Sequence, residues 1–311
     1  MSSIITITFN PCIDKSTTIA ALAPEKKLIC SKPTFEPGGG GINVARAIKK
    51  LGSEATAIYP AGGYSGKFLQ LLLEKENVKS LVVETAKHTR ENMIVLDLSS
   101  NQQFRFGMPG QALSTDECDK CLQLLEENES EYIIASGSLP PGVSPDVFEM
   151  IGKIAEKQNR KLIIDTSGDA LKSALHAHAY LIKPNLGELS KLAGVEELGY
   201  NDISKAARKL INETGCKIFL VSMGSSGAML ITKDESYMVS APPVKRQSTV
   251  GAGDSMVAGV VVSLSKGKNL KEAIHYGVAC GTAATINPGT ELCKIKDVNR
   301  IYEDVIALHV T

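Results

Sequence analysis

The chain has 311 residues, with 34 Lys and Arg against 34 Asp and Glu, so its formal net charge at pH 7 is zero. A balanced charge argues against a protein that coats nucleic acid or an anionic membrane, because such partners select for a basic excess. The length allows one large domain or two of ordinary size, and 43% hydrophobic residues are enough for a folded core.

No basic and apolar leader is visible at the start, and the most apolar run, residues 258–264, is much shorter than the ~18 residues of a membrane span. We therefore expect a cytoplasmic protein whose 7 cysteines are reduced. Cys118 and Cys121 have the spacing of a metal or redox pair, but no second pair completes a zinc site. Ser114 and Glu117 instead mark the start of an ordinary helix around them.

Short runs rich in β-branched residues alternate with segments of helical periodicity. In chain order, strands are expected at 3–9, 54–60, 131–137, 161–168, 179–185 and 216–222, and helices at 42–52, 67–76, 117–128, 145–158 and 202–215. A hairpin at 222–240 precedes two long helices, 253–266 and 270–287. This order predicts an α/β fold, a three-layer α/β/α sandwich with a mostly parallel central sheet.

Two stretches break the alternation. Residues 15–36 and 89–107 carry strand-like patterns with no helix between their strands. We expect them to form a small second sheet, a β-sheet lid over one edge of the main domain. The whole chain, 1–311, is then one domain whose lid comes from two insertions.

Polar residues that follow predicted strands are candidates for a site, because ligands of open parallel sheets bind at the carboxyl ends of the strands. Asp14 is placed at such a strand end, where a turn and a binding site explain it equally well. Asn185 and Glu188 open a helix after a later strand, and Glu188 is either a Mg²⁺ ligand acting through water or a capping residue. Gly224 and Gly227 form either an ordinary turn or a wall of bare backbone beside a nucleotide.

Four consecutive glycines, Gly38 to Gly41, precede a predicted helix. Glycine loses much conformational entropy on folding, so a plain loop is a poor explanation for four of them. No Gly-Lys-Ser/Thr follows, and Ile58 and Tyr59 occupy the place of the acidic residue of a dinucleotide site. We therefore expect a loop that faces a ligand at a helix N-terminus, with Asn43 as a hydroxyl partner, rather than a structural hinge.

A second glycine-rich segment, residues 249–254, leads from a strand end into a helix. The backbone N–H groups from Ala252 to Asp254 would meet at the positive end of that helix and form an anion hole. A carboxylate in such a hole suits a phosphoryl transfer: the hole stabilises the phosphoryl charge, and Asp254 accepts the proton of the attacking hydroxyl. The alternative is an Asp that only complements the helix dipole.

These segments, "GGGGINVARA" (38–47) and "TVGAGDSMVAG" (249–259), resemble the two signature regions of the ribokinase-like carbohydrate kinases of the phosphofructokinase B type. The resemblance covers nearly the whole chain. It implies ATP-dependent phosphorylation of the 1-hydroxyl of fructose 6-phosphate, with Mg²⁺ and K⁺, by a homodimer that pairs through its lids.

The resemblance also implies a role for individual residues. Asp254 is the base, and the amides of Gly251, Ala252 and Gly253 form the anion hole. The substrate-binding residues are Asp14, Gly39, Asn43, Arg90, Arg105 and Ser138. The ATP-binding residues are Lys183, Asn185, Ser222, Gly224, Gly227, Thr249 and Lys27. The metal-binding residues are Glu188 for Mg²⁺ and Ser248, Val250, Ala284, Asn287 and Gly289 for K⁺.

The two lid arginines, Arg90 and Arg105, have a physical argument of their own. A substrate that already bears a phosphate needs fixed positive charge away from the reacting hydroxyl, and arginine binds phosphate through two parallel hydrogen bonds. The alternative is a solvated strand face. The pattern departs from the family at Gly187, Pro288 and Glu291.

Other functions stay open at this point. A kinase of the same family could prefer tagatose 6-phosphate or fructose 1-phosphate, or act on a nucleoside. A sugar-phosphate sensor without activity is a rival of a different class, although Asp254 and its flanking glycines are all present.

Overall fold

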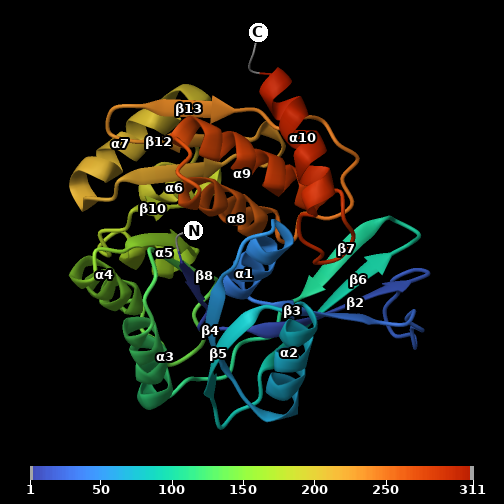
Figure 1. Ribbon diagram of the computed structural model, residues 1–311. Helices are drawn as coiled ribbons and strands as arrows, with labels where there is room; N and C mark the ends of the chain where they lie inside the picture. The colour runs from blue at the N-terminus through green and yellow to red at the C-terminus, as the bar shows by residue number, and fades with distance from the viewer. Residues whose placement is uncertain (1–2, 309–311) are drawn as a thin grey trace.

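The structure is a computed structural model that describes residues 3–308, so the extreme ends of the expected 1–311 domain lie outside it. A nine-stranded sheet forms its centre, in the order β13-β12-β11-β10-β9-β8-β1-β4-β5 (Figure 1). Its strands are β1 (Ile4–Ile7), β4 (Thr56–Ala61), β5 (Lys79–Glu84), β8 (Tyr132–Ser136), β9 (Lys161–Asp165), β10 (Leu181–Ile182), β11 (Ile218–Ser222), β12 (Ala228–Ile231) and β13 (Ser236–Val239). Neighbours pair in parallel from β5 to β11, and only β12 and β13 are antiparallel.

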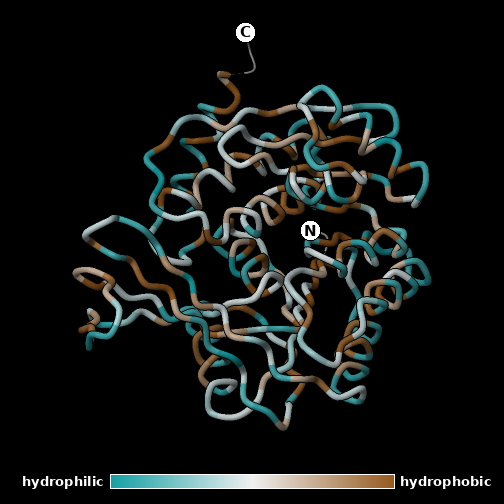
Figure 2. The backbone as a smooth tube through the Cα atoms, turned by 180° about the vertical axis from the view of Figure 1, so that it is seen from behind, coloured by the Kyte–Doolittle hydropathy of each residue, from teal (hydrophilic) through white to brown (hydrophobic). Residues whose placement is uncertain are grey.

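Helices cover both faces of this sheet, as expected for strands that are buried on both sides. One face is packed by α1 (Gly40–Lys50), α2 (Gly63–Lys75), α8 (Ala252–Ser265), α9 (Leu270–Thr285) and α10 (Ile295–Ala307). The other is packed by α3 (Thr115–Glu127), α4 (Val147–Lys157), α5 (Gly168–Ala174), α6 (Leu186–Leu192) and α7 (Ile203–Thr214). Helices on both faces of the sheet confirm the expected three layers. In Figure 2 many of the outer turns are hydrophilic, whereas hydrophobic stretches run through the interior.

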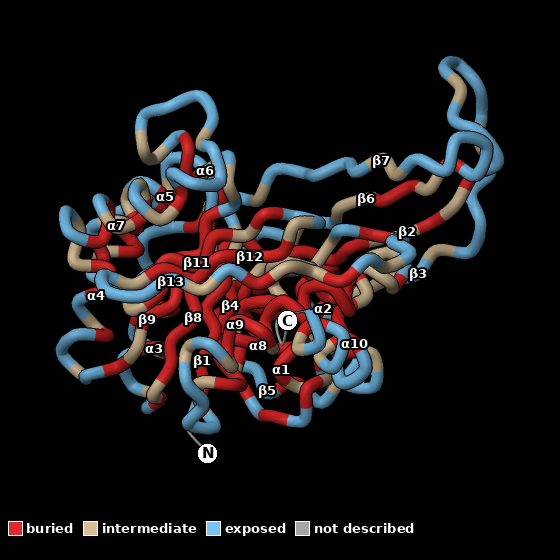
Figure 3. The backbone as a smooth tube through the Cα atoms, turned by 90° about the horizontal axis from the view of Figure 1, so that it is seen from above, coloured by how far each residue is buried: buried red, intermediate tan, exposed pale blue. Residues whose placement is uncertain are grey.

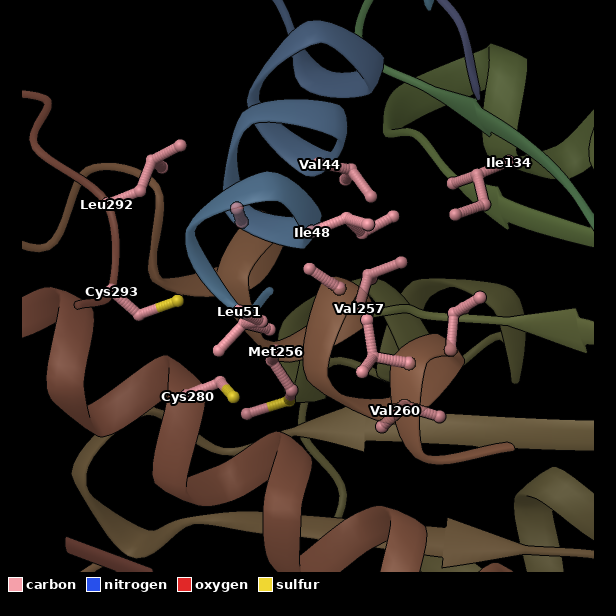
Figure 4. Packing of buried hydrophobic residues seen from close by; sticks show 14 of the residues in the cluster. Val44, Ile48, Leu51, Ile134, Met256, Val257, Val260, Cys280, Leu292 and Cys293 are labelled. Atoms are coloured by element: carbon pink, nitrogen blue, oxygen red, sulfur yellow. The ribbon is translucent and has the colours of Figure 1, made fainter. Parts of the chain in front are cut away.

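The contact between α1 and α8 matters most for the site, because each of these helices starts with a glycine-rich loop. Figure 4 shows Val44 and Ile48 of α1 on the side where Val257 of α8 lies, with Ile134 of β8 nearby. These side chains are buried. Burial of an aliphatic side chain contributes about 1.5–3 kcal/mol, so this packing holds the N-terminal ends of the two helices in a fixed relation.

A second sheet has four strands in the order β3-β2-β6-β7. They are β2 (Cys12–Ile19), β3 (Thr34–Gly38), β6 (Arg90–Asp97) and β7 (Gln102–Phe106), so both expected insertions contribute. Figure 3 shows this lid sheet projecting from the main body, with its outer end exposed. The expectation of a small β-sheet lid is confirmed.

Some elements differ from the expectation. The sequence pattern does not predict β5, α5 or α10, and β5 is hard to recognise because only Val83 of this edge strand is fully buried. Asp14 does not lie at a strand end: β2 begins at Cys12, and Asp14 is its third residue. The chain passes from β1 of the main sheet directly into β2 of the lid, with no helix between them. Asp14 therefore lies in the lid sheet and not at the edge of the main sheet.

The strand order reverses at β1, which lies between β8 and β4. From β1 the chain builds the lid and then β4 and β5 on one side, whereas β8 to β11 extend the sheet on the other. Such a switch point leaves a crevice at the carboxyl ends of the two central strands, where ligands of open α/β sheets bind. Among the described residues, no helix is long and apolar enough to span a membrane.

Candidate active site

The crevice contains the start of α8, where the sequence predicts an anion hole. Gly251 caps the helix with a left-handed φ of 73°, a conformation that glycine adopts without strain. The first N–H groups of any helix, here from Ala252 onward, have no partner within the helix, and the helix dipole adds partial positive charge. These amides can therefore hold an anionic oxygen.

Asp254 lies in this first turn, and its carboxylate has a defined partner. The Asn43 side-chain amide donates to it, with 3.0 Å between Nδ2 and Oδ2. Burial of the carboxylate and the negative charge of Asp165 raise the pKa of Asp254 to about 7, although the Asn43 hydrogen bond and Lys183 act in the opposite direction. Asp254 is half-buried and keeps some contact with solvent. A pKa near neutral suits a general base.

Lys183 and Asp165 form a buried ion pair beside Asp254. The register of β9 and β10 pairs Ile182 with Ile164, so the next residues, Lys183 and Asp165, meet at the carboxyl edge, with Nζ 3.0 Å from Oδ1. Burial alone would lower the pKa of Lys183, but Asp165 outweighs this and the pKa is raised, which keeps the ammonium charged. A Cβ on Gly253 would lie 3.4 Å from Nζ. Lys183 therefore adds positive charge to the anion hole.

Asp165 is not among the residues predicted from the sequence. The sequence does contain a signal for this residue: Asp165 is the last residue of β9, and ligands of open parallel sheets bind at the carboxyl ends of the strands. Its role depends on its ion pair with Lys183, and this pair can be recognised only when β9 and β10 are known to be neighbours in the sheet.

The glycine run at Gly38 to Gly41 lies against the ends of β1 and β8. Gly39 has a φ of 112°, and a Cβ on Gly40 would collide with Ser136 and Gly137. The loop therefore needs glycine in order to place the N-terminus of α1 in the crevice. Close packing is one reason for these glycines, and the same packing brings Asn43 to Asp254.

The lid contributes a polar group around Asp14, which is buried and close enough to Asp254 for its charge to raise the pKa of that carboxylate. Asn92 donates to Asp14, with 2.9 Å between Nδ2 and Oδ1. Cys12 donates to the same oxygen at 3.4 Å. Burial and the nearby Asp14 charge raise the pKa of Cys12 well above its usual value, so its thiol stays protonated. Asp14 is held in place by these neighbours.

Arg90 and Ser138 come together around Asn10. The guanidinium of Arg90 donates to the carbonyl oxygens of Asn10 and Met108, both at 3.0 Å. The Asn10 side-chain amide donates to the Ser138 hydroxyl at 3.1 Å. Among the residues that the structure describes, Nε of Arg90 is buried without a hydrogen-bond partner. A buried donor of this kind is uncommon and marks a place for a further acceptor.

Arg105 reaches from β7 of the lid to the loop before α8, where its Nη2 donates to the Thr249 hydroxyl at 2.9 Å. Arg105 is predicted to bind the sugar phosphate and Thr249 the nucleotide, and in the structure the two side chains contact each other. Lys27 is different. It is exposed on the loop between β2 and β3, which Figure 3 shows directed away from the main body. Within one chain the structure does not bring Lys27 to the crevice.

Asn185 and Glu188 form a capping box at the start of α6. The Glu188 N–H donates to Oδ1 of Asn185, and the Asn185 N–H donates to Oε2 of Glu188, both at 2.8 Å. The prediction that Glu188 is a capping residue is therefore confirmed, and binding of Mg²⁺ would be a second role of the same side chain. Among residues 3–308, no group of three or more His, Cys, Asp or Glu side chains could hold a metal ion alone.

Ser222 ends β11 beside Asn185, and the two form an isolated bridge. Gly224 and Gly227 turn the chain into β12 with φ values of 60° and 98°. A Cβ on Gly227 would collide with the backbone of Val239 and Ala241, so close packing already explains this glycine.

The residues predicted to bind potassium lie on the loop before α8 and at the C-terminal end of α9 with the loop that follows it. The Ser248 hydroxyl donates to the Gly289 carbonyl at 2.7 Å and accepts from the Val250 N–H at 3.2 Å. Asn287 ties its own loop together through side-chain bonds to Ala283 and Leu292, and its N–H donates to the Ala284 carbonyl. An open groove of about 890 Å³ separates the lid from this region, and Ser16, Ile94 and Gly289 are among its walls.

Comparison with known proteins identifies the family. The model of the pfkB family of carbohydrate kinases matches residues 3–297. The chain belongs to the pfkB family. A curated relative of this pfkB kinase, the ATP-dependent 6-phosphofructokinase isozyme 2 of Escherichia coli, is 45% identical over 304 residues, which cover 97% of this chain and 98% of the relative.

Solved structures agree with this pfkB assignment. Phosphofructokinase-2 from E. coli in complex with fructose 6-phosphate has a TM-score of 0.93 at 43% identity, and its complex with potassium has 0.94 at 44%. A tetrameric inhibited form of the same enzyme has 0.93 at 44%. Each of these three comparisons covers 98% of this chain and 100% of the E. coli chain.

Proposed function

We propose that the chain is an ATP-dependent 6-phosphofructokinase, which transfers the γ-phosphoryl group of ATP to the 1-hydroxyl of fructose 6-phosphate. The observation that carries this proposal is the position of Asp254, a carboxylate with a pKa raised to about 7 that lies in the first turn of a helix with free amides. A base and an anion hole at one point suit an attacking hydroxyl and a phosphoryl group in transfer.

The proposed step is an in-line displacement. Asp254 accepts the proton as the 1-hydroxyl oxygen forms its bond to the γ-phosphorus, and the bond from that phosphorus to the bridging oxygen of ADP breaks. The amides of Gly251, Ala252 and Gly253 hold the oxygens of the transferred group. Lys183, kept charged by Asp165, neutralises part of the charge that develops. The products are fructose 1,6-bisphosphate and ADP.

The 6-phosphate is assigned to Arg90, Arg105 and Ser138. The buried Nε of Arg90 needs an acceptor, and a phosphate oxygen supplies one with a charge-assisted hydrogen bond. Arg105 would exchange its contact with Thr249 for the phosphate. Asp14, Gly39 and Asn43 are assigned to the sugar hydroxyls, since their polar groups lie between the lid and α8.

ATP is assigned to the strand ends beyond the anion hole, with Lys183, Asn185, Ser222, Gly224, Gly227 and Thr249 as its walls. Lys27 fits this set only if it comes from the lid of a second subunit. We include a homodimer through the lid sheet in the proposal, and the tetrameric form of the E. coli relative shows that a similar chain assembles. The proposal takes 1–311 as one kinase domain in the cytoplasm.

Two cations belong to the proposal. Mg²⁺ is usually held by substrate phosphates with one or two carboxylates, and Glu188 fits this role because its second carboxylate oxygen is outside the capping bond. When bound, Mg²⁺ neutralises phosphate charge. K⁺ is assigned to the loops of Ser248, Val250, Ala284, Asn287 and Gly289, whose hydroxyl and carbonyl oxygens suit a hard cation. The potassium complex of the E. coli relative supports this assignment.

A coupled ADP assay tests the function. The purified protein with MgATP, with and without K⁺, is given fructose 6-phosphate, tagatose 6-phosphate, fructose 1-phosphate and a nucleoside at equal concentrations. We expect the highest kcat/KM for fructose 6-phosphate. A higher kcat/KM for tagatose 6-phosphate would instead assign the site to that sugar, and binding of sugar phosphate without ADP release would favour the sensor.

A further inference from the structure

Arg46 of α1 is the largest side chain that the fold buries completely, with 1% of its surface exposed, and it does not contact the reacting groups. Its guanidinium forms a two-pronged ion pair with Glu76, with Nε at 2.9 Å and Nη2 at 2.6 Å from the carboxylate oxygens. Nη1 donates to the Pro37 carbonyl at 2.7 Å, and Glu36 lies 3.5 Å from Nη2. The guanidinium is therefore held in one place by α2 and by the base of the lid.

The same guanidinium makes one contact that leads to the active site. Nη1 lies 3.3 Å from Oδ1 of Asn43, one turn earlier in α1. Arginine has only donors, so it can face only the oxygen of the Asn43 amide. The amide nitrogen must then point the other way, and it is this nitrogen that donates to Asp254 at 3.0 Å. If the Asn43 amide rotated by half a turn, two oxygens would face each other at Asp254.

We propose that Arg46 is a positioning residue, which fixes the orientation of the Asn43 amide and thereby keeps an N–H donor on the carboxylate of Asp254. The inference rests on the proposed function, in which Asp254 is the base. Arg46 acts only through Asn43. Its role is to determine which end of that amide the base meets.

The consequence concerns the proton affinity of Asp254. The groups that face this carboxylate are Asp14 and Cys12 from the lid, Asp165 and Lys183 from the sheet, and Asn43 from α1. Burial, Asp165 and Asp14 favour the protonated form, whereas Asn43 and Lys183 favour the ionised form. Loss of the Asn43 donor therefore raises the pKa of the base, so less of the enzyme is active at low pH.

The test is the pH profile of kcat/KM for Arg46→Met, which keeps the bulk of the side chain without charge or donors. We expect the acidic limb of the profile to move to higher pH by about half to one unit. At pH 6 kcat/KM should then be about three- to tenfold lower than that of the parent enzyme, and at pH 8.5 it should be little changed. In an Asn43→Ala background, Arg46→Met should produce no additional shift. A merely structural role would lower the rate by the same factor at every pH.

Glu76→Gln is the matched control, because it weakens the ion pair of Arg46 without removing the contact to Asn43. Its melting temperature should fall, and its acidic limb should stay in place. If Arg46→Met does not fold, Arg46→Lys carries the test, since it retains the charge between Glu36 and Glu76 and should show a smaller shift in the same direction.

An unmoved acidic limb in the folded Arg46 variant overturns the inference, and so does an equal shift in Glu76→Gln. An Asp254→Asn enzyme that keeps the parental kcat would overturn the proposed function instead. The two failures are therefore distinguishable.

Discussion

The carboxyl edge of the main sheet and the lid sheet place functional groups in opposite ways. At the edge, Asp254 and Lys183 each have a fixed partner, Asn43 and Asp165, on buried elements. In the lid, β7 is mostly exposed, and Arg105 donates hydrogen bonds to Gln103 and Thr249. The groups assigned to chemistry are therefore rigid, and Arg105, which is assigned to substrate capture, is easier to rearrange.

This difference follows from what each region has to do. A base and an anion hole work best when their geometry does not change during the reaction. A lid that admits and then encloses a substrate must exchange contacts, so its charges are better placed on a sheet with few buried neighbours. Substitutions at the edge should accordingly change kcat, and substitutions in the lid should change KM.

The largest effect is expected for Asp254→Asn. Asparagine keeps the shape but cannot accept the hydroxyl proton, so kcat should fall by about 10²- to 10⁴-fold with little change in KM. A steady-state assay with fructose 6-phosphate measures this. The variant should be at least as stable as the parent at pH 8, because a buried carboxylate is removed. A KM effect without a kcat effect would contradict the assignment of the edge to chemistry.

The lid arginines should show the reverse pattern. Arg105→Ala removes a charged donor from the 6-phosphate and should raise KM about 10- to 100-fold with a small change in kcat. Arg90→Ala should act in the same direction. Arg300→Ala, an exposed arginine on α10, is the control and should leave both constants unchanged. Activity on a sugar without a phosphate should not depend on Arg105. An equal rise in KM for that sugar and for fructose 6-phosphate would contradict the assignment of Arg105 to the 6-phosphate.

The pH profile of the parent enzyme should have an acidic limb near pH 7. Burial and Asp165 raise the pKa of Asp254 to that value, and only the ionised form can accept a proton. Below pH 7, kcat/KM should fall about tenfold per pH unit. Arg105→Ala should leave the limb in place, because Arg105 bonds Gln103 and Thr249 and not Asp254. A midpoint near 4 would show that the carboxylate is not desolvated.

The smallest effect is expected at Glu188, where capping and metal roles overlap. Glu188→Gln should raise the Mg²⁺ concentration for half-maximal rate by several-fold up to about tenfold. Glu272 has the same capping box with Asn269 at the start of α9, so Glu272→Gln is a matched control. Both variants should lose a similar, small amount of stability. An equal change in the Mg²⁺ requirement would assign Glu188 to capping alone.

The sequence pattern predicts the parts of the site that lie close together along the chain. Gly251 to Asp254 are assigned to an anion hole and a base within four residues, and the glycine run with Asn43 opens a helix. Both features can be recognised from local rules. Asp165 and Arg46 cannot be recognised in this way. Asp165 gains its role from the register of β9 against β10, and Arg46 from the packing of α1 against α2 and the lid.

Sequence by itself determined the layered fold, the presence of a lid and the positions of the two glycine loops at helix starts, because hydrophobic period, glycine spacing and helix starts are local properties. Only the tertiary structure decided that Asp14 belongs to a lid strand, that Lys27 lies away from the crevice and that Arg105 reaches Thr249. Contacts between residues more than a hundred positions apart depend on strand order and helix packing, which no local pattern contains.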